Sequence, residues 1–168
     1  MRRLDDKCTV ESFNLLEIML VGRAVSAVVH ELYPEGVPPE NSRGTLIVAT
    51  LEGDVHDLGK NIVKMVLIGK GYRVVDLGRD CPVATLVAAT AREAASGVLI
   101  SGLISSIVPQ VRRVRPALRT HGLGSVWVVA GGAALKQCAA ADLDVDYVAE
   151  NAFDGARYIE ARFTGTTP

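Results

Sequence analysis

Residues 46–61 read Leu46-Ile47-Val48-Ala49-Thr50-Leu51-Glu52-Gly53-Asp54-Val55-His56-Asp57-Leu58-Gly59-Lys60-Asn61, and this stretch decides the fold. It starts with a short, nearly continuous apolar run with branched side chains, which predicts a strand buried on both faces. A polar loop follows, and from Gly59 to Gly69 the apolar residues recur at helical spacing. A buried strand, a short loop and a helix form the unit from which parallel sheets are built.

The same strand–helix unit recurs along the rest of the chain. We expect strands at Leu46–Thr50, Arg73–Asp76, Gly97–Ser101, Val126–Ala130 and Tyr147–Ala149. Helical patterns lie near Gly59–Gly69, Val83–Ala95, Ile107–His121, Ala134–Ala141 and Ala152–Ala161. Five such units predict an α/β domain with a doubly wound, five-stranded parallel sheet. Ligands of such domains bind beyond the carboxyl ends of the strands.

A shorter region precedes this domain. Apolar residues at three- and four-residue steps predict a helix from Ser12 to Tyr33, which Pro34 ends. Residues 34–44 are rich in Pro, Gly and Asn, as linkers are. The sequence therefore predicts a short helical segment with its linker at residues 1–43, and the α/β domain at residues 44–168. Because one helix cannot bury its own apolar face, we expect the segment to pack on its own domain, pair with a second copy or dock on a partner.

Composition narrows the class of protein. Apolar residues make up 49% of the chain, and the formal net charge is −1, which gives no electrostatic case for nucleic-acid binding. No apolar run reaches the ~18 residues of a membrane span, and no apolar signal segment follows the first residues. The sequence therefore predicts a cytoplasmic protein that binds neither nucleic acid nor membrane.

The loop after the first strand carries an aspartate, Asp54, two residues before a histidine, His56. Histidine is the commonest metal ligand, and a carboxylate on its second ring nitrogen is the usual support. The alternative is a structural loop histidine that hydrogen-bonds to a neighbouring carboxylate. The glycines of the loop follow neither the G-x-G-x-x-G nor the P-loop pattern, so a nucleotide-binding loop is not indicated.

Two further elements fall at the same edge of the predicted sheet. Ser101-Gly102-Leu103 ends the third strand, and Gly131-Gly132 ends the fourth. Because the carboxyl ends of parallel strands lie at one edge, both elements should lie near His56. There are 41 residues between Gly59 and Ser101, and 27 between Leu103 and Gly131.

This spacing matches the cobalamin (B12)-binding pattern D-x-H-x-x-G, S-x-L and G-G. From Gly44 to about Phe163 the chain resembles the cobalamin-binding domain of methionine synthase and of methyltransferase corrinoid proteins. The sequence segments Glu52–Val63 and Val74–Gly78 are typical of the methyl-transfer branch of this family. The resemblance implies a Rossmann-like, flavodoxin-type B12-binding fold and a corrinoid cofactor, with methylcobalamin expected. His56 would be the lower axial ligand of its cobalt, and Asp54 would hydrogen-bond the distal imidazole nitrogen.

The resemblance also implies which other residues bind the cofactor. Gly59 would let the displaced nucleotide tail pass close to the helix start, and Ser101, Leu103 and Ser105 would line the slot that receives it. Glycines in the G-G pair lack side chains that would block that slot. The full set of expected cofactor-binding residues is Asp54, Val55, His56, Asp57, Gly59, Ser101, Leu103, Ser105, Gly131, Gly132 and Ala152.

One position departs from the family pattern. Many members carry a hydroxyl residue two positions beyond the site of Ser105, which completes a relay from the axial histidine through the aspartate. Here that position is Ile107. The third member of the relay is therefore absent, or Ser105 or Ser106 supplies it.

The functions implied by the resemblance differ in what they do with the cofactor. The first is a corrinoid carrier that accepts and donates a methyl group on cobalt between partner methyltransferases, with a reductive activation protein as a further partner and a homodimer through the N-terminal helix as one assembly. In this function the catalytic subunits are separate proteins. The alternatives are the small subunit of an adenosylcobalamin-dependent mutase, a B12 storage or sensor module, and a flavodoxin-like domain in which His56 is structural.

Overall fold

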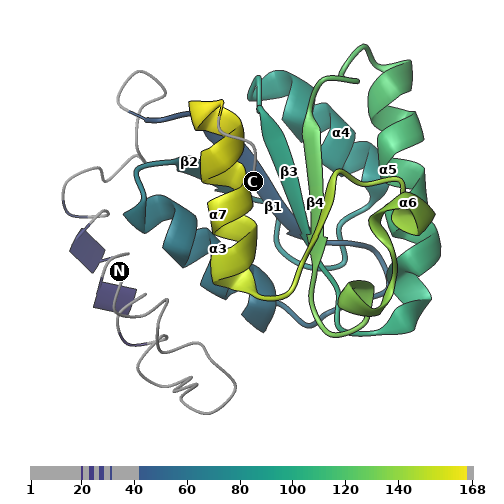
Figure 1. Ribbon diagram of the computed structural model, residues 1–168, viewed down its shortest axis with the longest axis horizontal. Coiled ribbons are helices and arrows are strands. Elements are labelled where there is room, and N and C mark those ends of the chain that lie inside the picture. The colour runs from purple at the N-terminus through teal and green to yellow at the C-terminus, as the bar shows by residue number, and fades with distance from the viewer. Residues whose placement is uncertain (1–19, 21–22, 25–26, 29–30, 32–41, 166–168) are drawn as a thin grey trace.

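The five strands form one parallel sheet in the order β2-β1-β3-β4-β5 (Figure 1). The computed structural model describes residues 20, 23–24, 27–28, 31 and 42–165. The strands are β1 (Thr45–Thr50), β2 (Arg73–Asp76), β3 (Gly97–Ser101), β4 (Trp127–Gly131) and β5 (Tyr147–Ala149). This is the strand order of doubly wound, flavodoxin-like domains, in which the winding reverses between β1 and β3. The predicted fold class is confirmed.

Helices cover both faces of the sheet (Figure 1). One face packs against α3 (Leu58–Gly69) and α7 (Ala152–Thr164). The other packs against α4 (Val83–Arg92), α5 (Val108–Thr120) and the short α6 (Ala140–Leu143). Two 3₁₀ turns, η3 (Ser105–Ile107) and η4 (Leu135–Gln137), follow β3 and β4.

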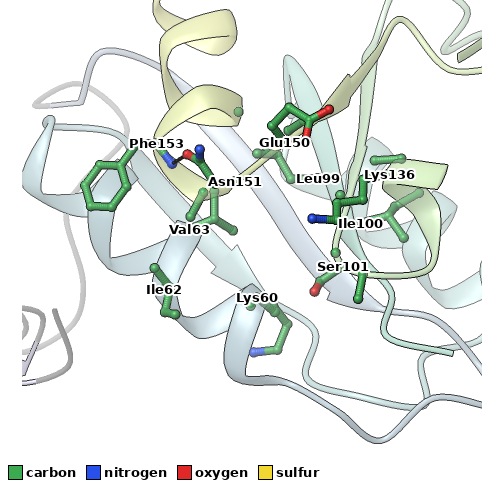
Figure 2. Close-up of a pocket in the computed structure, with 18 residues that line it drawn as sticks. Lys60, Ile62, Val63, Leu99, Ile100, Ser101, Lys136, Glu150, Asn151 and Phe153 are labelled. Carbon is green, nitrogen blue, oxygen red and sulfur yellow. Dashed lines mark hydrogen bonds between the residues drawn. The ribbon is translucent and has the colours of Figure 1, made fainter. Parts of the chain in front are cut away.

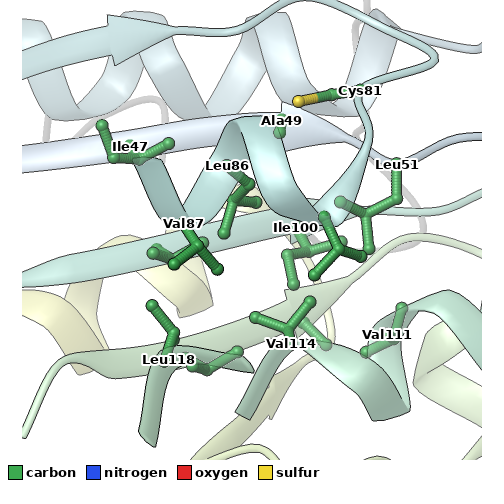
Figure 3. Packing of buried hydrophobic residues seen from close by; sticks show 14 of the residues in the cluster. Ile47, Ala49, Leu51, Cys81, Leu86, Val87, Ile100, Val111, Val114 and Leu118 are labelled. Atoms are coloured by element: carbon green, nitrogen blue, oxygen red, sulfur yellow. The ribbon is translucent and has the colours of Figure 1, made fainter. Parts of the chain in front are cut away.

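The apolar run of β1 feeds both layers of the core. All six of its residues are buried. Ile47 and Ala49 lie in the cluster with α4 and α5, which Figure 3 shows from close by. Leu46 and Val48 lie in the cluster with α3 and α7. Successive side chains of a strand point to opposite faces, so a strand covered on both sides must be apolar throughout.

The register of the sheet brings the ends of four strands together. Thr50 pairs with Ser101, Ser101 with Gly131, and Gly131 with Ala149. Residues from separate sequence motifs therefore lie side by side at the carboxyl edge. The loops that follow these strands form the ligand-binding edge of this fold class.

The predicted strands agree with the observed ones to within one residue. The predicted helix Ala134–Ala141 is wrong, because the chain forms η4, becomes extended at Cys138 and Ala139, and then forms α6. Leu135 is the one large apolar side chain of that segment, which gives a single helix too little apolar surface to hold it on the sheet.

Most of the predicted helix Ser12–Tyr33 lies outside the described residues. Its described residues, 20, 23–24, 27–28 and 31, are helical. The division of the chain at residues 43 and 44 stays a prediction. Among the described residues, no helix is both long enough and apolar enough to cross a membrane.

Candidate functional site

The loop between β1 and α3 holds Asp54 and His56 in a fixed pair. The Asp54 side chain is fully buried, whereas that of His56 is 50% exposed. Asp54 Oδ1 accepts hydrogen bonds from the His56 ring nitrogen Nδ1 at 2.7 Å and from the His56 backbone amide at 2.9 Å. The hydroxyl of Thr50 donates to the His56 carbonyl at 3.4 Å. The imidazole is thus held at one nitrogen by a carboxylate beneath it.

The second carboxylate oxygen of Asp54 joins this loop to the loop after β3. Asp54 Oδ2 accepts from the backbone amides of Leu103 at 2.7 Å and Ile104 at 3.4 Å. Burial would raise the pKa of Asp54, but the hydrogen bonds from the amides and imidazole outweigh it and hold the pKa below 3.8. An ionised carboxylate only accepts hydrogen bonds, so Nδ1 of His56 carries a proton, and in the neutral imidazole Nε2 is the nitrogen with the free lone pair. The site therefore presents a histidine prepared to ligate a metal ion.

Large apolar side chains are exposed on the two loops that Asp54 joins. Val55 and Leu58 from the first loop, and Leu103 and Ile104 from the loop after β3, are between 37% and 57% exposed. These four side chains form what we call the apolar platform. Val55, Leu58 and Leu103 line the same hollow as His56. Exposed apolar groups that gather around a polar centre mark a binding surface, here one suited to a broad apolar ligand.

A cavity of ≈ 270 Å³ extends from this edge between the sheet, α3 and α7; we call it the α3–α7 cavity (Figure 2). Its walls are mostly apolar, and they include Ile62, Leu99, Ala149 and Phe153. The cavity and the hollow beside His56 share the lining residues Gly59, Ser101, Gly132 and Ala133. A ligand on the apolar platform could therefore extend a second part into the cavity.

Glycines keep this route open in two different ways. A Cβ added at Gly131 would lie 3.5 Å from the Ala149 carbonyl oxygen, an ordinary contact, so the missing side chain there leaves free volume in the cavity. Gly132 has φ +100°, and its Cβ would lie 2.4 Å from the carbonyl oxygen of Gly102. Gly132 is therefore required by the backbone itself, and not chiefly by the space a ligand needs.

The other expected cofactor-binding residues are distributed unevenly. Asp57 is the N-cap residue of α3 and lines the hollow with His56. Ala152 begins α7 and lines the α3–α7 cavity. Ser105 is exposed at the start of η3 and belongs to the lining of neither space. The structure thus places ten of the eleven expected residues at the hollow, at the cavity or beneath His56, and leaves Ser105 outside.

The missing relay hydroxyl is not replaced by a serine. Ile107 is fully buried in the core beneath α5. Ser105 and Ser106 are exposed, and within residues 42–165 neither hydroxyl bonds to Asp54. The backbone amides of Leu103 and Ile104 take that place.

The sequence reasoning missed a buried ion pair beside the site. Lys60 is 2% exposed, and its ammonium donates to both oxygens of Asp76 at 2.7 and 2.8 Å. Lys64 adds a bond to the same carboxylate at 2.8 Å. Burial would raise the pKa of Asp76, but bonds from both lysines and the Gly78 amide hold it below 3.8. The signal was an aspartate at the end of a predicted strand, β2, whose residues are only partly buried. This pair ties the first turn of α3 to β2.

Fold and site together define a flavodoxin-like domain that binds an extended ligand at its carboxyl edge, with a histidine available to a metal. The family model "B12 binding domain" matches residues 44–157. The chain therefore belongs to the B12-binding domain family, and its cofactor is a corrinoid. A corrinoid fits the residues present: one free imidazole nitrogen, an apolar platform around it, and a cavity behind it.

Relatives and solved structures agree with this family. The chain is 35% identical over 142 residues to dimethylamine corrinoid protein 3 of Methanosarcina mazei, covering 82% of this chain and 84% of the relative. It is 33% identical over 132 residues to the methanol corrinoid protein of Methanosarcina barkeri, covering 79% of this chain and 50% of that relative. The chain thus spans about half the length of the second relative.

Two solved structures resemble the chain closely in fold. The methanol:cobalamin methyltransferase complex of Methanosarcina barkeri matches with a TM-score of 0.82 at 30% identity, covering 98% of this chain and 62% of that chain. A cobalamin-binding protein of Desulfitobacterium hafniense matches with a TM-score of 0.75 at 28% identity, covering 91% of this chain and 72% of that chain.

Proposed function

We propose that this chain is a corrinoid carrier protein of a methyltransferase system, with His56 as the lower axial ligand of cobalt. The observation that carries the proposal is the Asp54–His56 pair. Its carboxylate holds one ring nitrogen and leaves the other for a metal, in a hollow that three side chains of the apolar platform also line. A structural histidine would need no such surface around it.

The protein residues position the cofactor and shield it. The apolar platform would hold the flat corrin ring, and the α3–α7 cavity would hold its nucleotide tail. Asp54 keeps the imidazole in one tautomer and raises its basicity. When bound, the corrinoid supplies the cobalt centre that carries a methyl group. The catalytic methyltransferases are then separate proteins, and this function requires no nucleophile from the chain itself.

Relatives support the methyl-transfer function over the alternatives. The curated relatives are named as dimethylamine, trimethylamine and methanol corrinoid proteins, and one structural match is a methanol:cobalamin methyltransferase complex. Partner methyltransferase subunits and a reductive activation protein follow from this function. The homodimer through the N-terminal helix and the cytoplasmic location stay predictions from the sequence.

The test starts from the full chain reconstituted with hydroxocobalamin and passed over a desalting column. We expect retained colour and, after reduction, methylation of the holoprotein by a corrinoid-dependent methyltransferase that is offered methanol, methylamines and aryl methyl ethers in turn. The visible spectrum reports the methylation. Protein that emerges colourless refutes corrinoid binding. Coloured protein that accepts no methyl group, but supports a carbon-skeleton isomerisation when it is reconstituted with adenosylcobalamin and paired with an isomerase large subunit, refutes the carrier function.

A further inference from the structure

Three charged residues line the α3–α7 cavity: Lys60, Lys136 and Glu150. Lys60 is 2% exposed, and its ammonium is already engaged with both oxygens of Asp76. Lys136 and Glu150 are exposed at the rim. Figure 2 shows the nitrogen of Lys136 turned toward the cavity and the carboxylate of Glu150 turned away from it. Lys136 is therefore the cation that a ligand in the cavity would meet.

The backbone fixes the place of Lys136 at this rim. Lys136 lies in η4, a turn that begins three residues after Gly132. Its amide donates to the Gly132 carbonyl at 3.0 Å, and the neighbouring Leu135 is fully buried. Within residues 42–165, the Lys136 ammonium has no hydrogen-bond or ion-pair partner. Its charge is free for a ligand.

The helix that begins at the far wall of the cavity does not offer the same attraction. Asn151 caps α7, and its side-chain oxygen accepts from the amides of Phe153 at 3.0 Å and Asp154 at 2.9 Å. Those amides are therefore already used. By contrast α3 begins without a side-chain cap, and its Gly59 lines the cavity, which adds to the attraction that Lys136 exerts on an anion.

The nucleotide tail of a complete corrinoid carries a phosphodiester with one negative charge. A charge that enters a mostly apolar cavity is costly unless it is paired. We propose that Lys136 pairs with this phosphodiester, so that the cavity favours corrinoids with a nucleotide tail over corrinoids without one. The inference rests on the proposed function, because it requires that the corrinoid tail enters the α3–α7 cavity.

The test compares aquocobalamin with diaquocobinamide, a corrinoid that lacks the nucleotide and its phosphate. Dissociation constants are measured by absorbance titration of the full chain, its Lys136→Met and Lys136→Arg variants, and Lys70→Met as a matched control. Lys70 pairs with Glu160 at 2.6 Å, and it does not line the cavity. We expect Lys136→Met to weaken cobalamin binding roughly three- to tenfold, as for a partly exposed charge pair, and to leave cobinamide binding unchanged.

Further outcomes complete the test. Lys136→Arg should keep most of the cobalamin affinity, and Lys70→Met should keep all of it. The inference is overturned if Lys136→Met binds cobalamin as the unmodified chain does, or loses affinity for both corrinoids equally. In those cases the unmodified chain still binds cobalamin, so the proposed function stands. If the unmodified chain binds neither corrinoid, the proposed function fails and the inference fails with it.

Discussion

Filling the α3–α7 cavity from Gly131 should remove cofactor binding without unfolding the protein. Gly131 lies at the end of β4 between Ser101 and Ala149. A Cβ there would make ordinary contacts with Ala149 at 3.5 and 3.6 Å, so the sheet can accept a side chain. In Gly131→Leu, that side chain would extend into the cavity, which measures ≈ 270 Å³. Deletion of a large apolar side chain from a core leaves a void of roughly 150 Å³, so leucine fills about half of the space.

The size of the effect follows from the surface that the nucleotide base could no longer bury. An aromatic group of this kind buries about 150–250 Å², which is about 4–6 kcal/mol at 25 cal/mol per Å². Part of that surface would stay covered by the cavity mouth, so we expect at least about 100-fold weaker cobalamin binding, about 2.8 kcal/mol. The free energy of unfolding without cofactor should change by about 1 kcal/mol or less.

The assay is absorbance titration with aquocobalamin, alongside urea unfolding of the cofactor-free protein. Gly124→Leu is the matched control, since Gly124 precedes β4 at the opposite edge and its Cβ would lie 3.6 Å from Arg119. It should bind cobalamin as the unmodified chain does. Gly131→Leu that folds normally and binds cobalamin with unchanged affinity would refute the role of the cavity.

Three further substitutions test the supports of the site. In Asp54→Asn, the new side-chain NH₂ group would face one of the donors that now bond to the carboxylate, either the His56 imidazole or the Leu103 amide. Corrinoid affinity should therefore fall about 10–100-fold in an absorbance titration, and an unchanged affinity contradicts the role of Asp54. Asp76→Asn leaves the buried Lys60 charge without its carboxylate and should cost about 2–4 kcal/mol in urea unfolding at pH 7. Because the folded-state pKa of Asp76 is lowered, its contribution is fully present above the ordinary aspartate pKa of about 4 and is lost as the pH falls through the lower folded value. Stability of the variant should therefore fall less steeply below about pH 4, and an equally steep fall contradicts the ion pair. Gly132→Ala should cost about 3–5 kcal/mol, from its positive φ and its approach to Gly102; a loss under about 1 kcal/mol in urea unfolding would show that the backbone can relax.

The sheet could be predicted from the sequence because doubly buried strands are apolar throughout and the helices between them show a helical apolar period. The apolar runs of β1 and β3 are buried on both faces, and nothing but a doubly covered sheet suits them. The segment 134–141 does not form the single helix that its sequence predicts. Its alanines favour a helix, but the segment has no apolar face that would hold one on the sheet. An arginine-rich run on a helix predicts a solvent-exposed face. Arg115 belongs to such a run, yet it is buried and donates to the Val126 carbonyl at 2.8 Å.

The candidate site was predictable in its side chains and not in its backbone contacts. Asp54 and His56 stand two residues apart, and their bond follows from that spacing. The amides of Leu103 and Ile104 that hold Asp54 come from a loop 49 and 50 residues away. Every residue has such an amide, so no residue type records the contact. The need for glycine at position 132 likewise depends on its positive backbone angle φ, which the sequence does not reveal.

The central claim is that His56 binds cobalt, and electron paramagnetic resonance of the cobalt(II) form tests it most directly. One axial nitrogen splits each cobalt line of the spectrum into three when it is ¹⁴N and into two when it is ¹⁵N. The full chain is produced with ¹⁵N-histidine and reconstituted with unlabelled cobalamin. We predict doublets in the labelled protein and triplets in the unlabelled protein, with the signature of the protein imidazole lost in His56→Ala. Triplets that persist in the labelled protein would show that the nucleotide base stays on cobalt, and would contradict the assignment of His56.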